Sequence, residues 1–365
     1  MAAADEDEGV PIIRFGIMGC ADIAKKVSRA IALAPNASIV AVASRDAGKA
    51  RRFIAENALP VGTKAYGSYD ALIEDEDIEA VYMPLPTSLH VRWAVAAAVK
   101  RKHVLLEKPT ALVVSDLDKI LEACEHNRVQ FMDGTMWMHY PRTARMKQVL
   151  SDPDLIGRIQ MIHSTRAFSA TPEFLETNIR IKPDLDSLGA LGDLGWYCIG
   201  AILWAVDYQL PRSATALPAV HSNKSGIILA CAASLHWDDG KVATFHCSFL
   251  CNTAMDIRIQ GTSGSLHVTD FVIPYQEDSA SFKLITGAHF AELHIGWSKM
   301  PDEVLTLTNL PQETLMVQEF ARLVGLILSS GGRPDPKWPD TSRTTQLVMD
   351  AVKKSIDLGF KPVTL

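Results

Sequence analysis

The 365-residue sequence lacks an uncharged apolar run long enough to cross a bilayer. The best candidate, residues 194–206, is shorter than the roughly 20 residues that a spanning helix needs, and Asp193 and Asp207 close it. The run therefore predicts a buried helix. The N-terminus also lacks the positive charge and the apolar segment of a secretory signal. We expect no membrane association, no export and a cytoplasmic location.

An excess of basic charge is missing as well. Lys and Arg number 36 against 42 Asp and Glu, and four of the acids occupy residues 5–8. The rest of the chain is nearly neutral, so it offers no basic stripe that could neutralise a phosphate backbone. We expect no nucleic-acid partner.

The six cysteines form no Cys-x-x-Cys pair and have no histidine at metal-ligand spacing. Cys247 and Cys251 would face the same way only on a helix, and their segment has the pattern of a strand. We therefore expect free thiols and no metal site.

From residue 12 to about residue 134, short apolar runs alternate with amphipathic stretches, which is typical of parallel βαβ units. The predicted strands are residues 12–18, 38–44, 80–86, 103–108 and 129–134, with a weak strand near residues 65–66. The predicted helices are residues 22–34, 46–56, 88–100 and 115–127. Each helix begins at Asp or Ser, residues that cap helix N-termini.

After about residue 150, strand-like segments follow one another with few helices between them. They are residues 158–168, 226–237, 241–250, 256–260 and 265–270, with a turn at residues 238–240 and later helices at residues 313–328 and 340–357. We predict an α/β protein with an N-terminal Rossmann domain, residues 10–138. Residues 139–365 form a C-terminal α/β domain with an open, mostly antiparallel sheet. In an alternative arrangement, its last helix, about residues 340–358, packs back on the first domain.

The first predicted strand leads into a turn of small residues. Gly16, Gly19, Ala21 and Ala24 allow a tight turn and a close approach of the backbone to a pyrophosphate, and the helix N-terminus favours negative charge. Ala21 departs from the G-x-G-x-x-G/A pattern, and the alternative is a turn that serves backbone geometry only. We interpret it as a dinucleotide site. The predicted contacts are Gly16, Gly19, Cys20, Ala21, Asp22 and Ile23.

The end of the second strand indicates which dinucleotide binds. NAD enzymes place an acidic residue there, whereas this strand ends in Ser44, Arg45 and Asp46. A hydroxyl and a guanidinium suit the 2′-phosphate of NADP(H), and Lys49 is a further candidate contact. If Arg45 is a solvated turn residue and Asp46 only caps the next helix, NAD(H) remains possible. We favour NADP(H).

Three residues point to a proton-transfer site. Lys108 leaves an apolar strand at its carboxyl end, where open α/β sheets bind ligands, and Pro109 restrains the backbone beside it. Asp193 and Tyr197 are four residues apart at the start of an apolar helix, which places them on one face. The alternatives are a solvated lysine, a helix-capping acid and a core tyrosine. Because the pKa of a phenol is about 10, Tyr197 needs a nearby cation such as Lys108 to act as a base.

These motifs resemble a known family. The glycine turn, residues 82–90 (YMPLPTSLH), residues 107–109 (EKP) and residues 192–197 (GDLGWY) are similar to the glucose-fructose oxidoreductase, inositol dehydrogenase and rhizopine catabolism (Gfo/Idh/MocA) oxidoreductases. The resemblance covers nearly the whole chain. Residues 136–142 and Tyr197 look most like the branch of dimeric dihydrodiol dehydrogenases and NADP-dependent D-xylose 1-dehydrogenases, including plant members. It implies a homodimer formed through the open sheet.

The resemblance also implies roles for individual residues. Lys108 would contact the nicotinamide ribose and the substrate hydroxyl, its bond with Pro109 would be cis, and Tyr197 replaces the His of an Asp-x-x-x-His pattern. Thr87 stands where Asn is usual in the cofactor loop, and His90 fits either a cofactor contact or a loop histidine with satisfied nitrogens. The cofactor contacts predicted in this way are Pro84, Leu85, Pro86, Thr87, His90, Glu107, Lys108 and Trp137.

The predicted substrate contacts are Trp137, His139, Arg180 and Tyr197. Trp137 is suited to stacking on a sugar face, although packing near a domain junction is the alternative. His139 and Arg142 follow it closely and are further candidates for the pocket wall. Arg180 precedes the apolar helix that carries Tyr197.

Together these residues predict an oxidoreductase with a small-molecule substrate. Tyr197 takes the proton of the substrate hydroxyl, Lys108 lowers the pKa of Tyr197, Asp193 positions the pair, and a hydride passes to the nicotinamide. D-xylose oxidised to its lactone is the lead substrate, and a trans-dihydrodiol is the other. The alternatives are an NADPH-dependent carbonyl or keto-sugar reductase and a non-catalytic regulator that binds NADP(H).

Overall fold

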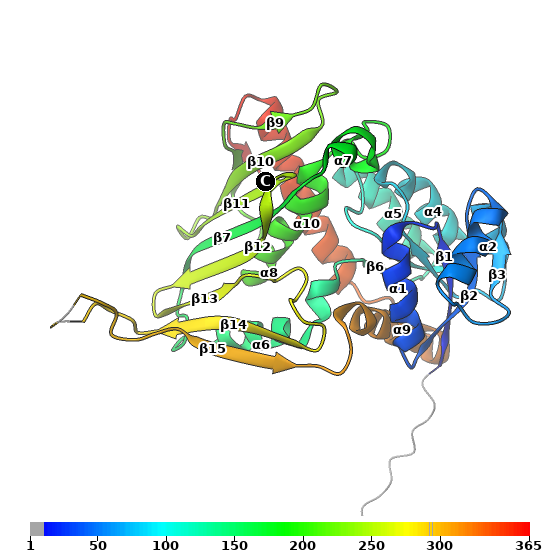
Figure 1. Cartoon of the computed structure of the whole chain (residues 1–365), viewed down its shortest axis with the longest axis horizontal. Coiled ribbons are helices and arrows are strands. Elements are labelled where there is room, and N and C mark those ends of the chain that lie inside the picture. Colours follow the sequence, from blue (N-terminus) through cyan, green and yellow to red (C-terminus); the bar gives the residue numbers. More distant parts are fainter. Residues whose placement is uncertain (1–10, 292, 294) are drawn as a thin grey trace, which may run out of the picture.

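The computed structural model of the chain describes residues 11–291, 293 and 295–365. The acidic residues 5–8 and the predicted domain start at residue 10 lie outside these ranges. Figure 1 shows a body of mixed helices and strands formed by the first third of the chain, beside a large twisted sheet formed by the rest. None of the helices within these ranges is both long and apolar enough to cross a membrane.

The N-terminal body is a parallel six-stranded sheet in the order β3-β2-β1-β4-β5-β6. Its strands are β1 (Ile13–Met18), β2 (Ala37–Ala43), β3 (Lys64–Tyr66), β4 (Ala80–Met83), β5 (His103–Leu106) and β6 (Phe131–Asp133). Its helices are α1 (Asp22–Leu33), α2 (Ala47–Glu56), α3 (Tyr69–Glu74), α4 (His90–Val99) and α5 (Val114–His126). This strand order is that of dinucleotide-binding Rossmann folds, so the predicted fold of this half is confirmed.

Apolar side chains form a core on each face of this sheet. One core contains residues of α1 and α2, and the other contains residues of α3, α4 and α5. The first core also includes Phe320 of α9 (Gln312–Ser330), whose ring centre lies 5.8 Å from that of Phe15 in β1. The last helix, α10 (Lys337–Asp357), contacts α5 and β6 as well as α8 and β8. Two C-terminal helices, and not the last one alone, therefore join the two bodies.

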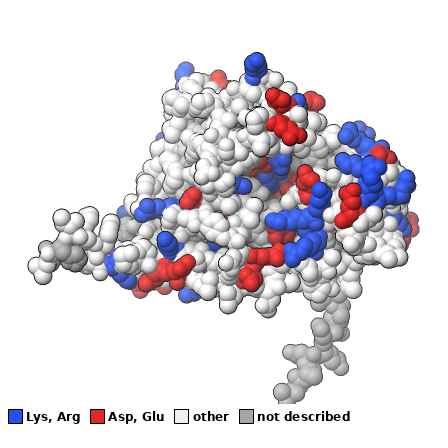
Figure 2. All heavy atoms as spheres, in the orientation of Figure 1, with Lys and Arg blue, Asp and Glu red and all other residues white. Residues whose placement is uncertain are grey.

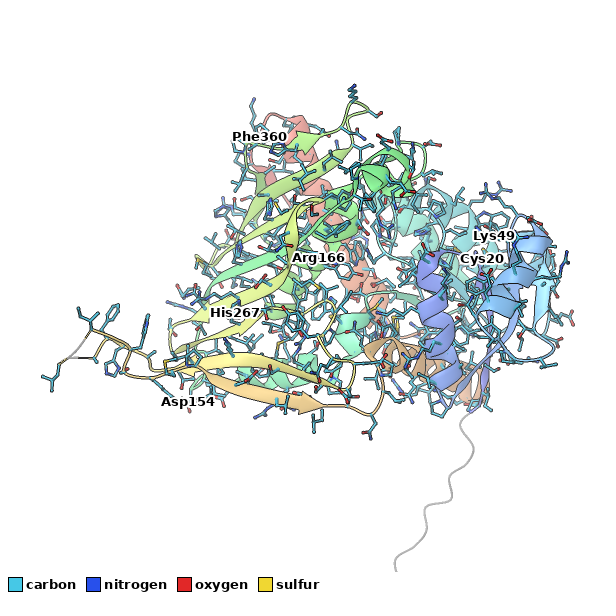
Figure 3. All side chains as sticks on the ribbon, viewed as in Figure 1. Cys20, Lys49, Asp154, Arg166, His267 and Phe360 are labelled. Atoms are coloured by element: carbon cyan, nitrogen blue, oxygen red, sulfur yellow. The ribbon has the colours of Figure 1, made fainter. Side chains whose placement is uncertain are left out.

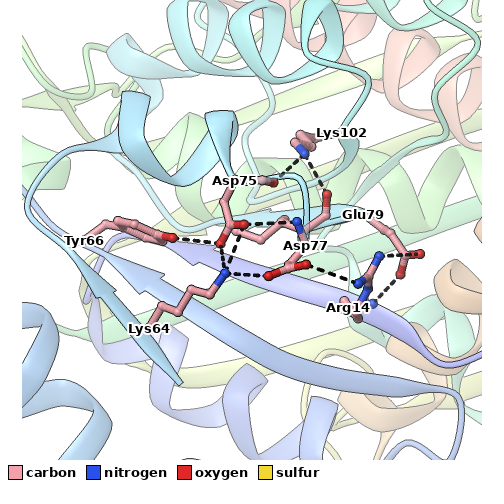
Figure 4. A network of polar contacts seen from close by, with 8 residues as sticks. Arg14, Lys64, Tyr66, Asp75, Asp77, Glu79 and Lys102 are labelled. Atoms are coloured by element: carbon pink, nitrogen blue, oxygen red, sulfur yellow. Dashed lines mark hydrogen bonds and ion pairs between the residues drawn. The ribbon is translucent and has the colours of Figure 1, made fainter. Parts of the chain in front are cut away.

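A polar network closes the amino-terminal edge of the parallel sheet (Figure 4). The Lys64 Nζ donates to Asp75 Oδ2 at 2.9 Å and to Asp77 Oδ2 at 2.6 Å, and the Tyr66 hydroxyl donates to Asp75 Oδ2 at 2.8 Å. The Lys102 Nζ donates to the Asp75 carbonyl oxygen at 2.7 Å. These contacts lie at the edge opposite the carboxyl ends of the strands, so they brace the sheet and leave the ligand-binding edge free.

The C-terminal body is a ten-stranded sheet in the order β15-β14-β13-β12-β7-β11-β10-β8-β16, with β9 paired to β10. All neighbours are antiparallel except β7 and β11. The helices α6, α8 and α10 pack on one face, whereas residues such as Met161 and His163 of β7 are exposed on the other (Figure 1). The prediction of an open, mostly antiparallel sheet is confirmed.

The elements of this body follow in chain order. Its helices before the last two are α6 (Pro141–Leu150), α7 (Pro172–Thr177) and α8 (Trp196–Ala205). Its strands are β7 (Ile159–Ser169), β8 (Ser213–Ala216), β9 (His221–Ser222), β10 (Ile228–His236), β11 (Val242–Ser248), β12 (Leu250–Gly261), β13 (Gly264–Val268), β14 (Ser279–Thr286), β15 (Asp302–Leu307) and β16 (Val363–Thr364).

The predicted strands 241–250 and 256–260 differ from those observed. The chain reverses after β11, and β12 begins at Leu250, several residues before the expected start. The pairing of β12 with β7 is irregular between Leu250 and Ala254. This irregular stretch is largely exposed and carries little apolar alternation, which is why the sequence pattern alone did not indicate a strand there.

Candidate active site

The three residues predicted to transfer protons lie together where the carboxyl end of β5 meets the start of α8. The Lys108 Nζ donates hydrogen bonds to Asp193 Oδ1 at 2.7 Å and to the Asp193 carbonyl oxygen at 2.9 Å. It also lies 4.5 Å from the centre of the Tyr197 ring. The peptide bond between Lys108 and Pro109 is cis, as the family resemblance implies.

A π-helical turn, Leu191–Gly195, carries Asp193 into the site immediately before α8. Such turns occur frequently at functional positions. The N-cap of α8 is Gly195, and no side chain caps this helix by a hydrogen bond. Asp193 therefore does not serve as a helix cap, which was the alternative interpretation. Its carboxylate faces cations instead.

Burial and charge compete at each member of this cluster. Burial raises the pKa of Asp193, but Arg180 and Lys108 more than offset this and hold it well below its ordinary value. Burial lowers the pKa of Lys108, but the charges of Asp193 and Tyr197 raise it by more, so the net pKa lies above the ordinary value. Burial raises the pKa of Tyr197, and the opposing charge of Lys108 does not restore it. Lys108 lowers the pKa of Tyr197 as expected, but burial is the larger effect, so the net pKa lies above the ordinary value and Tyr197 keeps its proton near neutrality.

Arg180 is brought to the same carboxylate by a short 3₁₀ turn, Ile179–Ile181. The Arg180 Nε lies 2.8 Å from Asp193 Oδ1. Asn178 caps the turn by accepting the Arg180 backbone N–H at 3.0 Å. The following loop is joined to the N-terminal body, because the Ser88 N–H donates to the Leu185 carbonyl oxygen at 3.1 Å.

Glu107 is buried beside this cluster and has a partner that the sequence analysis missed. The Tyr82 hydroxyl donates to Glu107 Oε1 at 2.6 Å. Burial raises the pKa of Glu107, although Tyr82 and Lys108 oppose it. A Cβ atom on Gly134, which follows β6, would lie 3.0 Å from Glu107 Oε1, so this glycine leaves room for the carboxylate. The sequence could have indicated this contact, because Tyr82 lies in a predicted apolar strand and a buried tyrosine hydroxyl needs a hydrogen-bond partner.

The glycine turn has the features of an anion site. Gly19 adopts a φ of 117°, which favours glycine, and a Cβ atom there would lie 3.0 Å from Leu85 Cδ2. The predicted loop at residues 84–87 therefore packs against the turn. No side chain caps the N-terminus of α1 by a hydrogen bond at Ala21. Free N–H groups at a helix N-terminus after a Rossmann β1 fit a pyrophosphate.

Two cations flank this turn. Burial raises the pKa of Cys20, and the positive charge of Lys49 opposes this rise. Burial also raises the pKa of Tyr69, and the positive charge of Arg45 opposes that rise. Figure 3 shows Cys20 and Lys49 close together beside α2. Asp46 caps α2, accepting the Gly48 N–H at 2.8 Å. Asp46 is thus a helix cap and Arg45 is exposed, which is the arrangement that leaves NAD(H) possible. The hydroxyl of Ser44 and the two cations still suit a 2′-phosphate.

His90 is buried, and both ring nitrogens face backbone carbonyls. Nε2 lies 2.9 Å from the Leu85 oxygen and Nδ1 lies 3.1 Å from the Thr110 oxygen. Burial lowers the pKa of its imidazole. A neutral imidazole carries one N–H and donates to only one of these two carbonyl oxygens. The ring lies at the start of α4 and joins the cofactor loop to the segment after Lys108, which fits a structural histidine.

Trp137, His139 and Arg142 are used for packing. The Trp137 ring lies edge-on to Trp204 and Phe271, both at 5.6 Å between ring centres. His139 stacks on Trp338 at 4.7 Å, and burial lowers its pKa to about 3. Arg142 is held in a buried ion pair with Asp270. These side chains are fixed by core partners, and none of the contacts joins them to Lys108, Asp193 or Tyr197.

The surface carries both signs of charge. In the view of Figure 2, Lys and Arg gather over the N-terminal body and are interspersed with Asp and Glu. This distribution matches the near-neutral composition.

Asp186 is a second carboxylate near the cluster, and the sequence analysis did not identify it. It is 4% exposed, and its Oδ1 accepts the Leu188 N–H at 3.2 Å. Burial, and then the charge of Asp193, raise its pKa to about 7 against the opposing charges of Arg180 and Lys108.

Asp186→Asn should make stability less dependent on pH. The folded protein binds the Asp186 proton more tightly than the unfolded chain, whose pKa is about 4. Titration of Asp186 therefore removes a few kcal/mol of stability from the wild type as the pH rises from about 4 to about 7, and this contribution is absent from the variant. Asn stays neutral and keeps an oxygen for Leu188. Urea unfolding across this range checks this, and identical slopes for both proteins would contradict it.

Comparisons with known proteins agree with this architecture. The model of the "Oxidoreductase family, NAD-binding Rossmann fold" matches residues 13–135, and that of the "GFO/IDH/MocA C-terminal domain" matches residues 143–267. A solved 3-ketoreductase from Actinomadura kijaniata, in complex with NADP and TDP-benzene, has a similar fold. It is 24% identical, with a TM-score of 0.79 over 94% of this chain and 98% of that one.

Two curated relatives are dehydrogenases. A D-xylose 1-dehydrogenase (NADP(+)) from Haloferax volcanii is 31% identical over 252 residues, 69% of this chain and 74% of the relative. A trans-1,2-dihydrobenzene-1,2-diol dehydrogenase from Danio rerio is 25% identical over 260 residues, 70% of this chain and 74% of the relative. The sequence motifs, the two-body fold and these relatives lead to one conclusion: the chain belongs to the Gfo/Idh/MocA family of oxidoreductases.

Proposed function

We propose that this oxidoreductase uses NADP(H) and transfers a hydride between the nicotinamide and an alcohol carbon of a sugar or a trans-dihydrodiol. D-xylose, oxidised to its lactone, is the lead substrate. The observation that carries the proposal is the buried contact of Lys108 with Asp193 and the ring of Tyr197. It lies at the carboxyl edge of a sheet whose first turn fits a pyrophosphate.

Each residue of the cluster has a chemical role. Tyr197 exchanges a proton with the substrate oxygen, and Lys108 orients that oxygen and stabilises the negative charge that develops on it. Asp193 holds the Lys108 ammonium in place through two hydrogen bonds. The bound nicotinamide cofactor supplies hydride chemistry. Burial of the cluster excludes water and strengthens these electrostatic contacts.

The choice of NADP(H) over NAD(H) rests on Ser44, Arg45 and Lys49. Arg45 offers planar, charged donors for a 2′-phosphate, and Asp46 is occupied as a helix cap. The name of the D-xylose dehydrogenase relative, which includes NADP(+), supports the same choice.

A keto-sugar or carbonyl reductase is the second candidate. The raised pKa of Tyr197, caused by burial, favours a residue that donates a proton, as carbonyl reduction requires. A regulator that binds NADP(H) without catalysis is less well supported, since a sensor has no use for the Lys108–Tyr197 pair.

We further propose a cytoplasmic homodimer formed through the exposed face of the ten-stranded sheet.

The first test is reduction of NADP and, separately, of NAD, followed by the absorbance of the reduced nicotinamide. The panel contains aldopentoses, aldohexoses, inositols and trans-dihydrodiols, and NADPH is tested with the corresponding carbonyl compounds. We expect NADP to be reduced by one substrate class, with D-xylose leading. Preference for NAD would overturn the interpretation of Ser44 and Arg45. No turnover in either direction would favour the regulator.

A further inference from the structure

Arg180 is the most exposed member of the cluster that contains Lys108, Asp193 and Tyr197. The side chains of Lys108 and Asp193 are each 9% exposed, whereas that of Arg180 is 36% exposed. Tyr197 is 7% exposed. A molecule that approaches the three buried residues therefore meets the guanidinium at the edge of the cluster. The mechanism described above gives this guanidinium no contact with the substrate.

Several contacts fix the position of Arg180. Asn178 Oδ1 accepts the Arg180 backbone N–H at 3.0 Å, and the Asn223 Nδ2 donates to the Ile181 carbonyl oxygen at 3.3 Å. The Arg180 Nε lies 2.8 Å from Asp193 Oδ1. The loop that follows is bonded to the cofactor loop of the N-terminal body. Because the guanidinium is held in advance, little side-chain entropy is lost when it binds a further group.

Three polar atoms of the cluster remain for a ligand. Lys108 Nζ and Arg180 Nε both contact Oδ1 of Asp193, at 2.7 and 2.8 Å, so that Oδ2 is left. The Arg180 Nη1 lies 3.5 Å from Asn178 Oδ1, which is a long contact for a hydrogen bond. Within the described ranges of the chain, Asp193 Oδ2, Arg180 Nη2 and the Tyr197 hydroxyl make no hydrogen bond, and none of them is sealed from solvent.

These atoms suit two neighbouring hydroxyl groups. In the proposed function, the first hydroxyl exchanges its proton with Tyr197. A hydroxyl on the adjacent carbon has one O–H to donate and lone pairs that accept, so it fits between Asp193 Oδ2 and Arg180 Nη2. The ion pair with Asp193 already balances the charge of Arg180. The free N–H groups therefore match a neutral hydroxyl and require no anion.

We propose that Arg180 binds the hydroxyl on the carbon next to the reacting carbon, so that the enzyme selects substrates with two adjacent hydroxyl groups. This inference rests on the proposed function, because it narrows the substrate class of the same site. D-xylose and a trans-dihydrodiol both carry such a pair. Simple alcohols and 2-deoxy sugars lack it and should be poor substrates.

Kinetics with pairs of alcohols that differ only in the neighbouring hydroxyl test the inference. The pairs are D-xylose with 2-deoxy-D-xylose, and trans-1,2-cyclohexanediol with cyclohexanol. With NADP, we expect kcat/KM to be about tenfold to a hundredfold higher for the diol, as for the loss of a hydrogen bond to a charged group. Arg180→Met should bring this ratio close to unity, even where it lowers both rates. Arg180→Lys should retain part of the ratio, since it keeps the charge and loses the planar fork.

Lys182→Met is the matched control. Lys182 lies two residues further along the same segment, and its Nζ donates to the Glu176 carbonyl oxygen at 2.8 Å and not to the cluster. This variant should leave the ratio unchanged. Thermal unfolding establishes that each variant is folded. A wild-type ratio close to unity, or a ratio that survives in Arg180→Met, would overturn the inference and leave the proposed function standing.

Calorimetry with the NADPH-saturated protein separates the inference from the proposed function. D-xylose should bind more tightly than 2-deoxy-D-xylose, and Arg180→Met should remove this preference. If these results are obtained but no alcohol or carbonyl compound is turned over, the proposed function fails and the Arg180 subsite is supported. Equal binding of the two sugars, or binding of neither, would count against the subsite.

Discussion

A Tyr197→Phe variant should lose about three orders of magnitude in kcat while binding NADP(H) as the wild type does. The change removes only the hydroxyl that we propose exchanges a proton with the substrate. The ring that lies 4.5 Å from the Lys108 Nζ remains, so the geometry of the cluster is preserved. General acid–base groups typically contribute factors of about 10² to 10⁴ to the rate.

Steady-state kinetics and fluorescence titration of NADPH measure the two quantities. Tyr208→Phe is the matched control, because that hydroxyl lies on a partly buried residue but contacts Met138 Sδ at 3.7 Å, outside the cluster. The control should keep kcat within a few fold. A Tyr197→Phe enzyme with near-normal kcat would show that another group transfers the proton.

Asp270→Asn should lower the free energy of unfolding by about 3 to 5 kcal/mol, because it leaves the Arg142 guanidinium buried without a counter-charge. The two side chains of this ion pair are 2% and 7% exposed. Arg142 also donates to the Ser281 carbonyl oxygen at 3.1 Å, and Asp270 Oδ2 accepts the Tyr275 N–H at 2.8 Å. The pair therefore joins α6 to β14 and to the loop after β13.

Asp238→Asn provides the comparison for this variant. Asp238 pairs with Arg212 at 3.0 Å, but both side chains are more than 70% exposed, so its loss should cost less than about 1 kcal/mol. Urea unfolding of both variants measures the difference. Similar losses for the buried and the exposed pair would mean that burial does not control the strength of these ion pairs.

Local features of the sequence were sufficient for the N-terminal half of the fold. The alternation of apolar runs and amphipathic stretches predicts βαβ units, because parallel strands are buried on both faces and their helices on one. The glycine turn, Lys108 after β5, and Asp193 four residues before Tyr197 are likewise local patterns. Each places a side chain relative to its own strand or helix.

Contacts between distant segments decided the rest. The sequence does not indicate whether His90, Trp137 or His139 faces a ligand or the core, because the same polar atom on a buried element serves either purpose. Their partners, such as Thr110, Phe271 and Trp338, come from other elements. Contacts between segments far apart in the sequence also determine the packing of α9 on the Rossmann core and the hydrogen bond from Tyr82 to Glu107.

The sequence by itself determined the βαβ half, the glycine turn and the residue types of the cluster formed by Lys108, Asp193 and Tyr197. Only the tertiary structure decided how strongly these groups hold their protons and which cations accompany them. The physical reason is that periodicity and spacing are properties of one segment, whereas burial and electrostatic interaction depend on what other segments bring within a few ångströms. Arg180 and Asp186 reach the neighbourhood of Tyr197 from the segment before α8, and Arg166 reaches it from β7.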